Sequence, residues 1–103
     1  MATINGQTQK RTTLVADTED EIQFANGIQK ISIVATSTSM ADTVYIKPIA
    51  NLTGADAAAW ANDTGALVLN PIVRSVELYF PGPVTSIFVG SAGAEEIQWY
   101  ESF

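Results

Sequence analysis

The chain has 103 residues, which suffice for one hydrophobic core and predict a single domain. Apolar residues make up 47% of the chain and charged residues 16%, against about 25% in typical domains, so we expect a surface poor in charge. The formal charge of −6 with scattered bases disfavours nucleic acid as a partner, and the absence of cysteine and histidine excludes disulfides, Cys/His zinc sites, Ser-His-Asp triads and Cys-His pairs.

The first thirteen residues, MATINGQTQKRTT, are mostly polar, and we predict an N-terminal arm over residues 1–13 that precedes a β-sandwich domain over residues 14–103. Chain ends fray unless they are tied down, so the arm is expected to be mobile in the free protein. It alternates weakly around Ile4 and carries the basic pair Lys10 and Arg11. These residues could dock on a partner by adding a strand to an exposed sheet edge. The alternative is that the segment forms the first strand of the sandwich itself.

Beyond the arm, apolar and polar residues alternate in short runs separated by turn residues, which is typical of antiparallel strands. About eight such strands predict an all-β fold, an antiparallel sandwich of jelly-roll type. In chain order the runs are KRTTLVA, EIQF, GIQKISIVAT, DTVYIKPI, GALVL, VELYF, SIFVG and EEIQWYE. We interpret Asn26-Gly27 and Pro81-Gly82-Pro83 as turns between separate strands.

One stretch interrupts the strand pattern. The sequence TGAD followed by an alanine-rich run predicts a short helix near residues 54–62, with Thr53 as its N-cap. Trp60 would be the apolar anchor of this helix and would cover one end of the sandwich.

The carboxylates offer few candidates for chemistry. The run Asp17-Thr18-Glu19-Asp20-Glu21 could supply oxygen ligands to Ca²⁺, but it lacks the glycine and the distal glutamate of a calcium loop, so we predict a solvated turn. Glu95 and Glu96 are adjacent, point to opposite faces of a strand and cannot act together on one substrate. We therefore expect no catalytic residue, no metal site and no cofactor, and an enzyme is the least favoured class.

The aromatic residues of the C-terminal third point to an interface. Alternation places Trp99 with the buried face, whereas Tyr79 and Tyr100 fall on the outer face of their strands and Phe103 ends the chain. Interface cores are rich in aromatic residues and poor in lysine and glutamate. We therefore predict that a protein partner or another subunit covers these three residues. A sugar-stacking platform is the alternative use of exposed tyrosines.

The chain begins with a polar segment, is acidic, lacks cysteine and histidine, contains strands such as ISIVATSTSMADTVYIKPI and ends in strand. In these features and in its length it resembles the small virion proteins of tailed bacteriophages, especially capsid decoration (cement) proteins. The resemblance implies a non-enzymatic protein that binds the outside of an assembled capsid and stabilises the particle. The implied partner is the major capsid protein.

We further expect a homo-oligomer, preferably a trimer because capsid docking sites commonly have threefold character, with no nucleic acid and no membrane as partners. The expected location is the virion, after synthesis in the host cytoplasm. The alternative function is a carbohydrate-binding or host-attachment module of a phage fibre or tail.

Overall fold

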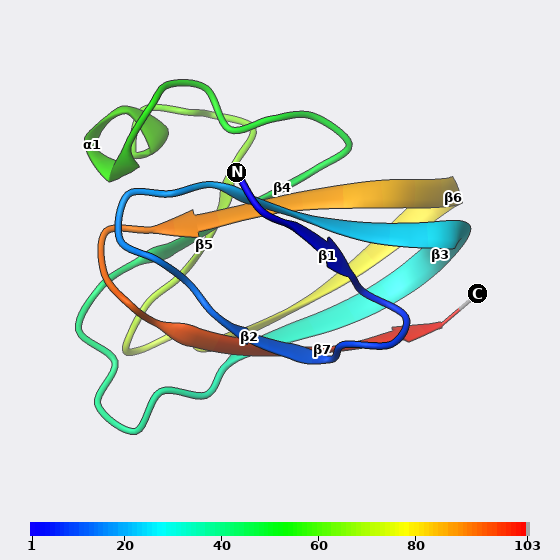
Figure 1. Cartoon of the computed structure of the whole chain (residues 1–103), viewed down its shortest axis with the longest axis horizontal. Coiled ribbons are helices and arrows are strands. Elements are labelled where there is room, and N and C mark those ends of the chain that lie inside the picture. The colour runs from blue at the N-terminus through cyan, green and yellow to red at the C-terminus, as the bar shows by residue number, and fades with distance from the viewer. Residues whose placement is uncertain (103) are drawn as a thin grey trace.

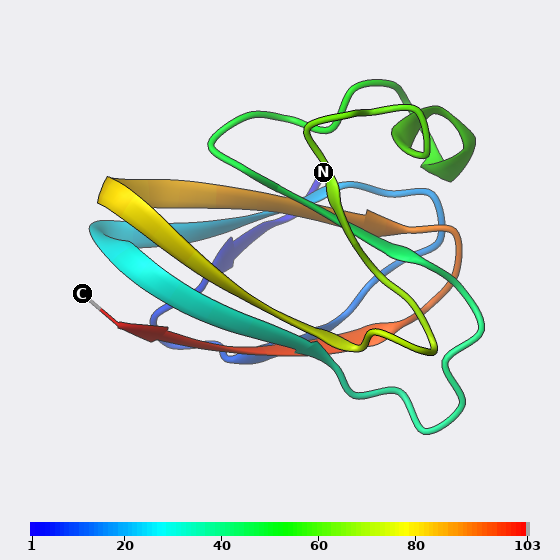
Figure 2. The same cartoon turned by 180° about the vertical axis from the view of Figure 1, so that it is seen from behind.

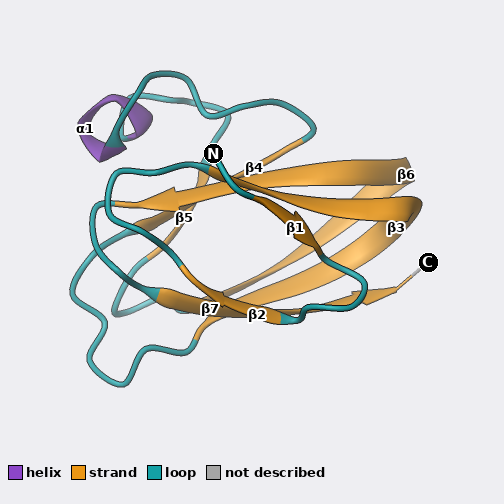
Figure 3. Cartoon of the chain, viewed as in Figure 1, coloured by secondary structure: helices purple, strands orange, loops and turns teal. Residues whose placement is uncertain are grey.

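The computed structural model describes residues 1–102 and contains seven strands and one short helix (Figures 1 and 3). Phe103, one of the predicted contact residues, lies outside the described residues. The sheet has the order β2-β7-β3-β6-β4-β5, and β1 pairs with β3. The elements are β1 (Thr3–Asn5), β2 (Arg11–Thr13), β3 (Asp20–Ala35), β4 (Val44–Pro48), α1 (Ala57–Trp60), β5 (Leu67–Leu69), β6 (Ser75–Ser91) and β7 (Glu96–Ser102).

Two long strands, β3 and β6, run through both layers of the fold. The first half of β3, residues 20–23, pairs with residues 86–89 of β6, whereas residues 30–34 pair with residues 75–79. The register shifts between these two halves, and Figure 1 shows both ribbons bending sharply at one end of the molecule. One layer thus holds β1, β4, β5, the first half of β3 and the second half of β6, and the other holds β2, β7 and the remaining halves.

The corner where β3 and β6 bend contains two sequence signals that we interpreted as turns. Gly27 has a φ of 73°, in the left-handed region that favours glycine. A Cβ at this position would lie 2.7 Å from Cβ of Pro83, so the two strands approach closely at the bend. Strands that pass from one layer to the other at such bends are a known way to build sandwich corners. Asn26-Gly27 and Pro81-Gly82-Pro83 are therefore bends within strands, and four of the predicted strands merge into two.

The predicted all-β sandwich is confirmed, and its core lies between the two layers. Period-two alternation assigns the faces of β7 correctly. Ile97 and Trp99 are fully buried, whereas Tyr100, the next residue, is exposed. The Trp99 indole Nε1 donates to the Gly6 carbonyl at 3.0 Å, which satisfies its buried N–H. Most strand pairs are antiparallel, as expected, but β1 lies parallel to β3.

The N-terminal segment does not form the free arm that we predicted. β1 pairs with residues 21–23 of β3, and β2 pairs with residues 96–98 of β7. Ile4 is only 7% exposed and belongs to the main core, so it is not available to a partner. The segment is ordered because its backbone completes two sheet edges and its one apolar side chain beyond the start is buried. The alternative interpretation, a first strand of the sandwich, matches the structure.

The helix is shorter than predicted and begins later. Its N-cap is Asp56, whose side chain accepts a hydrogen bond from the Ala59 N–H at 3.1 Å, so the predicted cap Thr53 is wrong. Trp60 is buried as expected, but it packs on the outer surface of a sheet layer instead of at one end of the sandwich. It stacks edge-on against Tyr45 with ring centroids 6.3 Å apart. A Cβ at position 90 of β6 would lie 2.5 Å from the indole, so Gly90 makes room for this contact.

Candidate functional site: the tyrosine face

The outer surface of the layer formed by β2, β7, the second half of β3 and the first half of β6 gathers several predicted contact residues. Strand pairing places Tyr79 opposite Lys30, Tyr100 opposite Ser32, and Arg11 opposite Gln98. The side chains that alternate with them point into the core. We call this surface the tyrosine face and define it as Arg11, Lys30, Ser32, Glu77, Tyr79, Glu96, Gln98 and Tyr100.

The two tyrosines are the main apolar groups on this face. Tyr79 is 68% exposed and Tyr100 is 61% exposed, on strands that flank β3 from either side. They are two strand spacings and two residue positions apart, which places their Cα atoms about 12 Å from each other. Two exposed tyrosines at this separation on one sheet surface can contact the same partner.

A small polar cluster holds Tyr79 in place. Its hydroxyl donates to Glu77 Oε2 at 2.8 Å, and the Lys30 Nζ lies 3.6 Å from the same oxygen. Nζ also lies 5.3 Å from the centroid of the Tyr79 ring, within cation–π range. The pKa of Lys30 is raised above its ordinary value, mainly by Tyr79 and to a smaller extent by Glu77. Lys30 therefore remains a cation whose charge is directed at groups of its own chain.

A second cluster supports Tyr100 from the other side of β3. The Gln98 Nε2 donates to the Tyr100 hydroxyl, and the Arg11 Nη2 donates to Gln98 Oε1 at 3.3 Å. The Arg11 Nε lies 3.9 Å from Glu96 Oε1, which also accepts from the Thr36 hydroxyl at 2.7 Å. Exposed ion pairs contribute little to stability, so the effect of this cluster is to order the side chains of the face.

The tyrosine face carries no net formal charge. Lys30 and Arg11 offset Glu77 and Glu96, so the formal charge of −6 arises entirely from residues elsewhere in the chain. An acidic protein thus presents one charge-balanced surface with two exposed aromatic rings. Such a surface is suited to contact with protein, because desolvating few uncompensated charges costs little.

The six predicted contact residues divide between several places. Arg11, Tyr79 and Tyr100 come together on the tyrosine face. Lys10 points away from it and forms an ion pair with Glu101, on the alternate side of β7. Ile4 is in the core and Phe103 is outside the described residues. Sequence reasoning missed Lys30, although alternation in GIQKISIVAT already placed it on an outer face; only the strand order brings it beside Tyr79.

The acidic run begins in a turn, as predicted, but its carboxylates do not simply face solvent. Asp17 Oδ1 accepts from the Ala57 N–H at 3.1 Å, and Glu19 Oε2 accepts from the Leu52 N–H at 2.7 Å. Asp20 is 5% exposed and accepts from the N-terminal segment. Asp17 and Glu19 thus fix the loop that carries α1, and Asp20 holds the N-terminal segment. Within residues 1–102, no group of three or more acidic, histidine or cysteine side chains is arranged to hold a metal ion.

Two further carboxylates hold loops. Asp63 accepts from the Thr53 N–H at 2.8 Å, from the Lys47 Nζ at 3.0 Å and from the Gly65 N–H at 2.9 Å, and the Thr53 and Lys47 bonds in particular hold its pKa well below the usual range. Burial raises the pKa of Glu95, but hydrogen bonds from the Ser37 side chain and from the N–H groups of residues 41 and 42 outweigh it, so the net shift is downward. Both groups are ionised structural acceptors at neutral pH.

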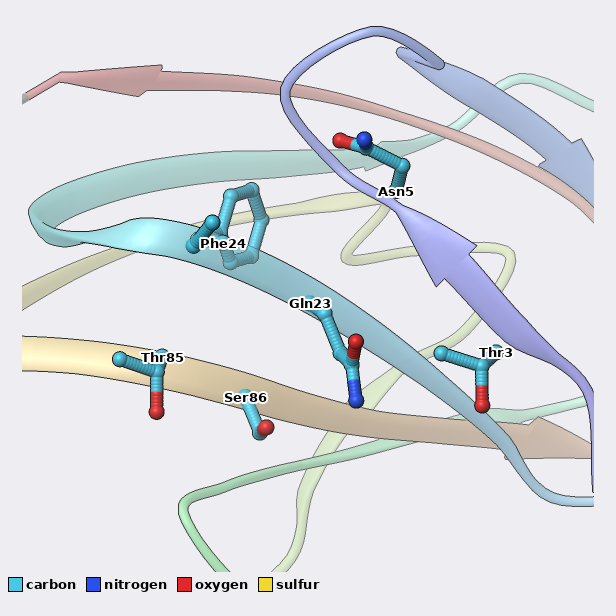
Figure 4. A pocket seen from close by; sticks show the side chains of 7 residues that line it. Thr3, Asn5, Gln23, Phe24, Thr85 and Ser86 are labelled. Atoms are coloured by element: carbon cyan, nitrogen blue, oxygen red, sulfur yellow. The ribbon is translucent and has the colours of Figure 1, made fainter.

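A polar groove lies on the outer surface of the opposite layer. It encloses about 330 Å³ over β1, the first half of β3 and the second half of β6 (Figure 4). Two of the residues that line it donate to Glu21: the Ser86 hydroxyl at 2.6 Å and the Gln23 amide at 3.3 Å. The lining residues are Thr3, Asn5, Gln23, Phe24, Ala25, Thr85 and Ser86. Hydroxyl and amide groups in this arrangement offer hydrogen bonds to a neutral polar ligand.

No protein-family model, curated protein or solved structure matches the chain. In the part of the chain that the structure describes, no helix has the length and apolar character needed to cross a membrane.

Proposed function

We propose that this protein is a non-enzymatic virion structural protein that binds the outer surface of an assembled capsid through its tyrosine face and stabilises the particle. The observation that supports the proposal most directly is the pair of exposed tyrosines, Tyr79 and Tyr100, on a charge-balanced sheet surface. The sequence resemblance to capsid decoration proteins supplies the class of partner.

The physical case rests on how such a face would bind. Tyrosine contributes a large contact area at small entropic cost and is enriched among residues that dominate binding energy. The hydrogen bonds from Tyr79 to Glu77 and from Gln98 to Tyr100 order both rings in the free protein, which lowers the cost of association further. Repetition over a symmetric shell then converts modest contacts into high avidity. The acidic remainder of the chain disfavours contact with packaged nucleic acid.

A double substitution tests the role of the face. Tyr79→Ala with Tyr100→Ala is expected to weaken binding to capsids that lack the protein by at least about tenfold, or 1.4 kcal/mol. The melting temperature should stay nearly constant, because both side chains are mostly exposed. The matched control is Ile49→Ala, which removes a side chain of similar exposure, 71%, outside the face. Co-sedimentation measures the affinities. A double variant that binds as tightly as the Ile49 control contradicts the proposal.

The polar groove favours one alternative, a carbohydrate-binding or host-attachment module. Sugars are recognised by hydrogen bonds to their hydroxyl groups, and the groove offers Thr3, Gln23 and Thr85 for that purpose. A glycan array separates the two functions. Specific glycan binding that is lost in Gln23→Ala with Thr85→Ala, and kept when both tyrosines are replaced, supports this alternative and contradicts capsid decoration through the tyrosine face.

A further inference from the structure

The first half of β6, residues 75–80, has one hydrogen-bonded neighbour and one open side. Within residues 1–102 it pairs with β3 alone, because β4 contacts only residues 87–91 of the same strand. Figure 2 shows this half, in yellow, along the near side of the molecule with the second half of β3 beside it. The open side is therefore a sheet edge with unpaired backbone donors and acceptors.

The hydrogen-bond pattern identifies which groups point to the open side. The Ala35 N–H donates to the Arg74 carbonyl at 2.7 Å, so residue 74 is hydrogen-bonded to β3. In an antiparallel ladder alternate residues bond to the same neighbour, so residues 76 and 78 also face β3. The N–H and C=O groups of Ser75, Glu77 and Tyr79 then point outward. Pro81 has the same parity, and its missing N–H would also lie on the open side, where proline is tolerated.

The edge also leaves part of the core uncovered. Val76, Leu78 and Phe80 pack against the main core but are only partly buried. They lie on the edge strand itself, so a strand added to this edge would reduce their exposure. Apolar surface and unpaired backbone groups occur on the same six residues, and an added β-strand satisfies both.

We propose that this edge pairs with the same edge of a second copy of the chain, antiparallel, with Glu77 opposite Tyr79 of the partner and Leu78 on the twofold axis. The edge sequence is self-complementary in this register. Residues 77 and 79 each exchange two backbone hydrogen bonds, and Leu78 meets Leu78 on the inner side.

Neighbouring registers that keep the hydrogen-bond parity are less favourable. If Glu77 lies opposite Glu77, two carboxylates meet directly, which is destabilising. If Tyr79 lies opposite Tyr79, residue 77 faces Pro81, which has no N–H to donate. In the proposed register Pro81 lies opposite Ser75, at the end of the ladder, and both pairs of residues 77 and 79 keep all their hydrogen bonds. The edge therefore favours a twofold dimer over the trimer that we expected from capsid symmetry. The dimer joins two tyrosine faces into one continuous surface, and its formation does not depend on the proposed function.

Single cysteines test the register, because the chain has no cysteine of its own. Leu78→Cys places two thiols in a non-hydrogen-bonded pair across the axis, where Cα atoms lie about 4.5 Å apart and a disulfide can form. Ile72→Cys is the control: it is 92% exposed, but the two copies of residue 72 would be more than about 20 Å apart. Under mild oxidation the first variant is expected to become a covalent dimer, whereas the second is expected to form no disulfide between copies.

A second variant tests the backbone bonds. Glu77→Pro removes the outward N–H from each copy, and with it two hydrogen bonds of the dimer, while the bonds to β3 are kept. The dimer dissociation constant measured by sedimentation should rise by about tenfold or more. Cross-linking of the Ile72 variant in preference to the Leu78 variant overturns the inference. So does a wild-type protein that remains monomeric up to millimolar concentration.

Discussion

Deleting residues 2–9 tests whether the N-terminal segment is part of the fold. The deletion removes Ile4 from the core and takes away the Gly6 carbonyl that accepts from the buried Trp99 indole. Loss of a buried isoleucine costs about 2 to 5 kcal/mol, and a buried N–H left without a partner costs about 1 to 3 kcal/mol. The total, about 3 to 8 kcal/mol, is comparable with the whole stability of a small domain. We expect the truncated protein to unfold, or to melt at least about 12 °C lower.

Urea denaturation followed by tryptophan fluorescence measures the effect, and two point variants isolate its cause. Ile4→Ala should lose about 2 to 5 kcal/mol of unfolding free energy. Thr3→Ala, on the same strand but exposed, should change it by less than about 0.5 kcal/mol. A truncated protein that melts within a few degrees of the full chain refutes this reasoning and restores the docking arm. An unfolded truncated protein rules that arm out.

Three further predictions concern α1, the loop that carries it and the contacts that hold them. Gly90→Ala should lower the free energy of unfolding, measured by urea denaturation, by about 1 to 3 kcal/mol, because the added Cβ meets the Trp60 indole. Gly82→Ala, where an added Cβ has no atom within 4 Å, should be nearly neutral. Equal losses in the two variants would contradict the packing of Gly90 against Trp60. Because the pKa of Asp63 is lowered in the folded state, ionised Asp63 stabilises the fold above about pH 4, and this stabilisation is lost as the pH falls below that value. The loss of unfolding free energy in Asp63→Asn should therefore become smaller on acidification. A loss that is independent of pH would count against this role of Asp63. Chelator should leave the melting temperature unchanged, because segment 17–21 caps backbone groups; a drop with EDTA that Ca²⁺ reverses would disprove this.

Alternation alone predicted which faces of the strands are buried. Trp99 and Tyr100 are adjacent aromatic residues, yet the first is buried and the second exposed. This follows from the two-residue period of a strand, because in a two-layer fold one face of each strand packs on the core and the other faces solvent. The same rule placed Tyr79 outside. These assignments are local and need no knowledge of which strands pair.

Features that depend on pairing were not predictable from the sequence. Asn26-Gly27 gives the same local signal for a hairpin turn and for a bend within a strand; only the partner of each flanking segment decides between them. The sequence of the N-terminal segment is too polar to predict a folded strand. Its one core residue, Ile4, is buried only because the segment pairs with β3, which is distant in the sequence. The tyrosine face required the order β7-β3-β6, which brings Lys30 between two tyrosines that are far apart in sequence.

Electron microscopy of intact particles from the source of the sequence tests the central proposal most directly. We predict density for this protein on the outside of the shell, with Tyr79 and Tyr100 against the capsid surface and the polar groove turned to solvent. A particle without this protein, or one in which the bound protein turns both tyrosines to solvent, would contradict the proposed function.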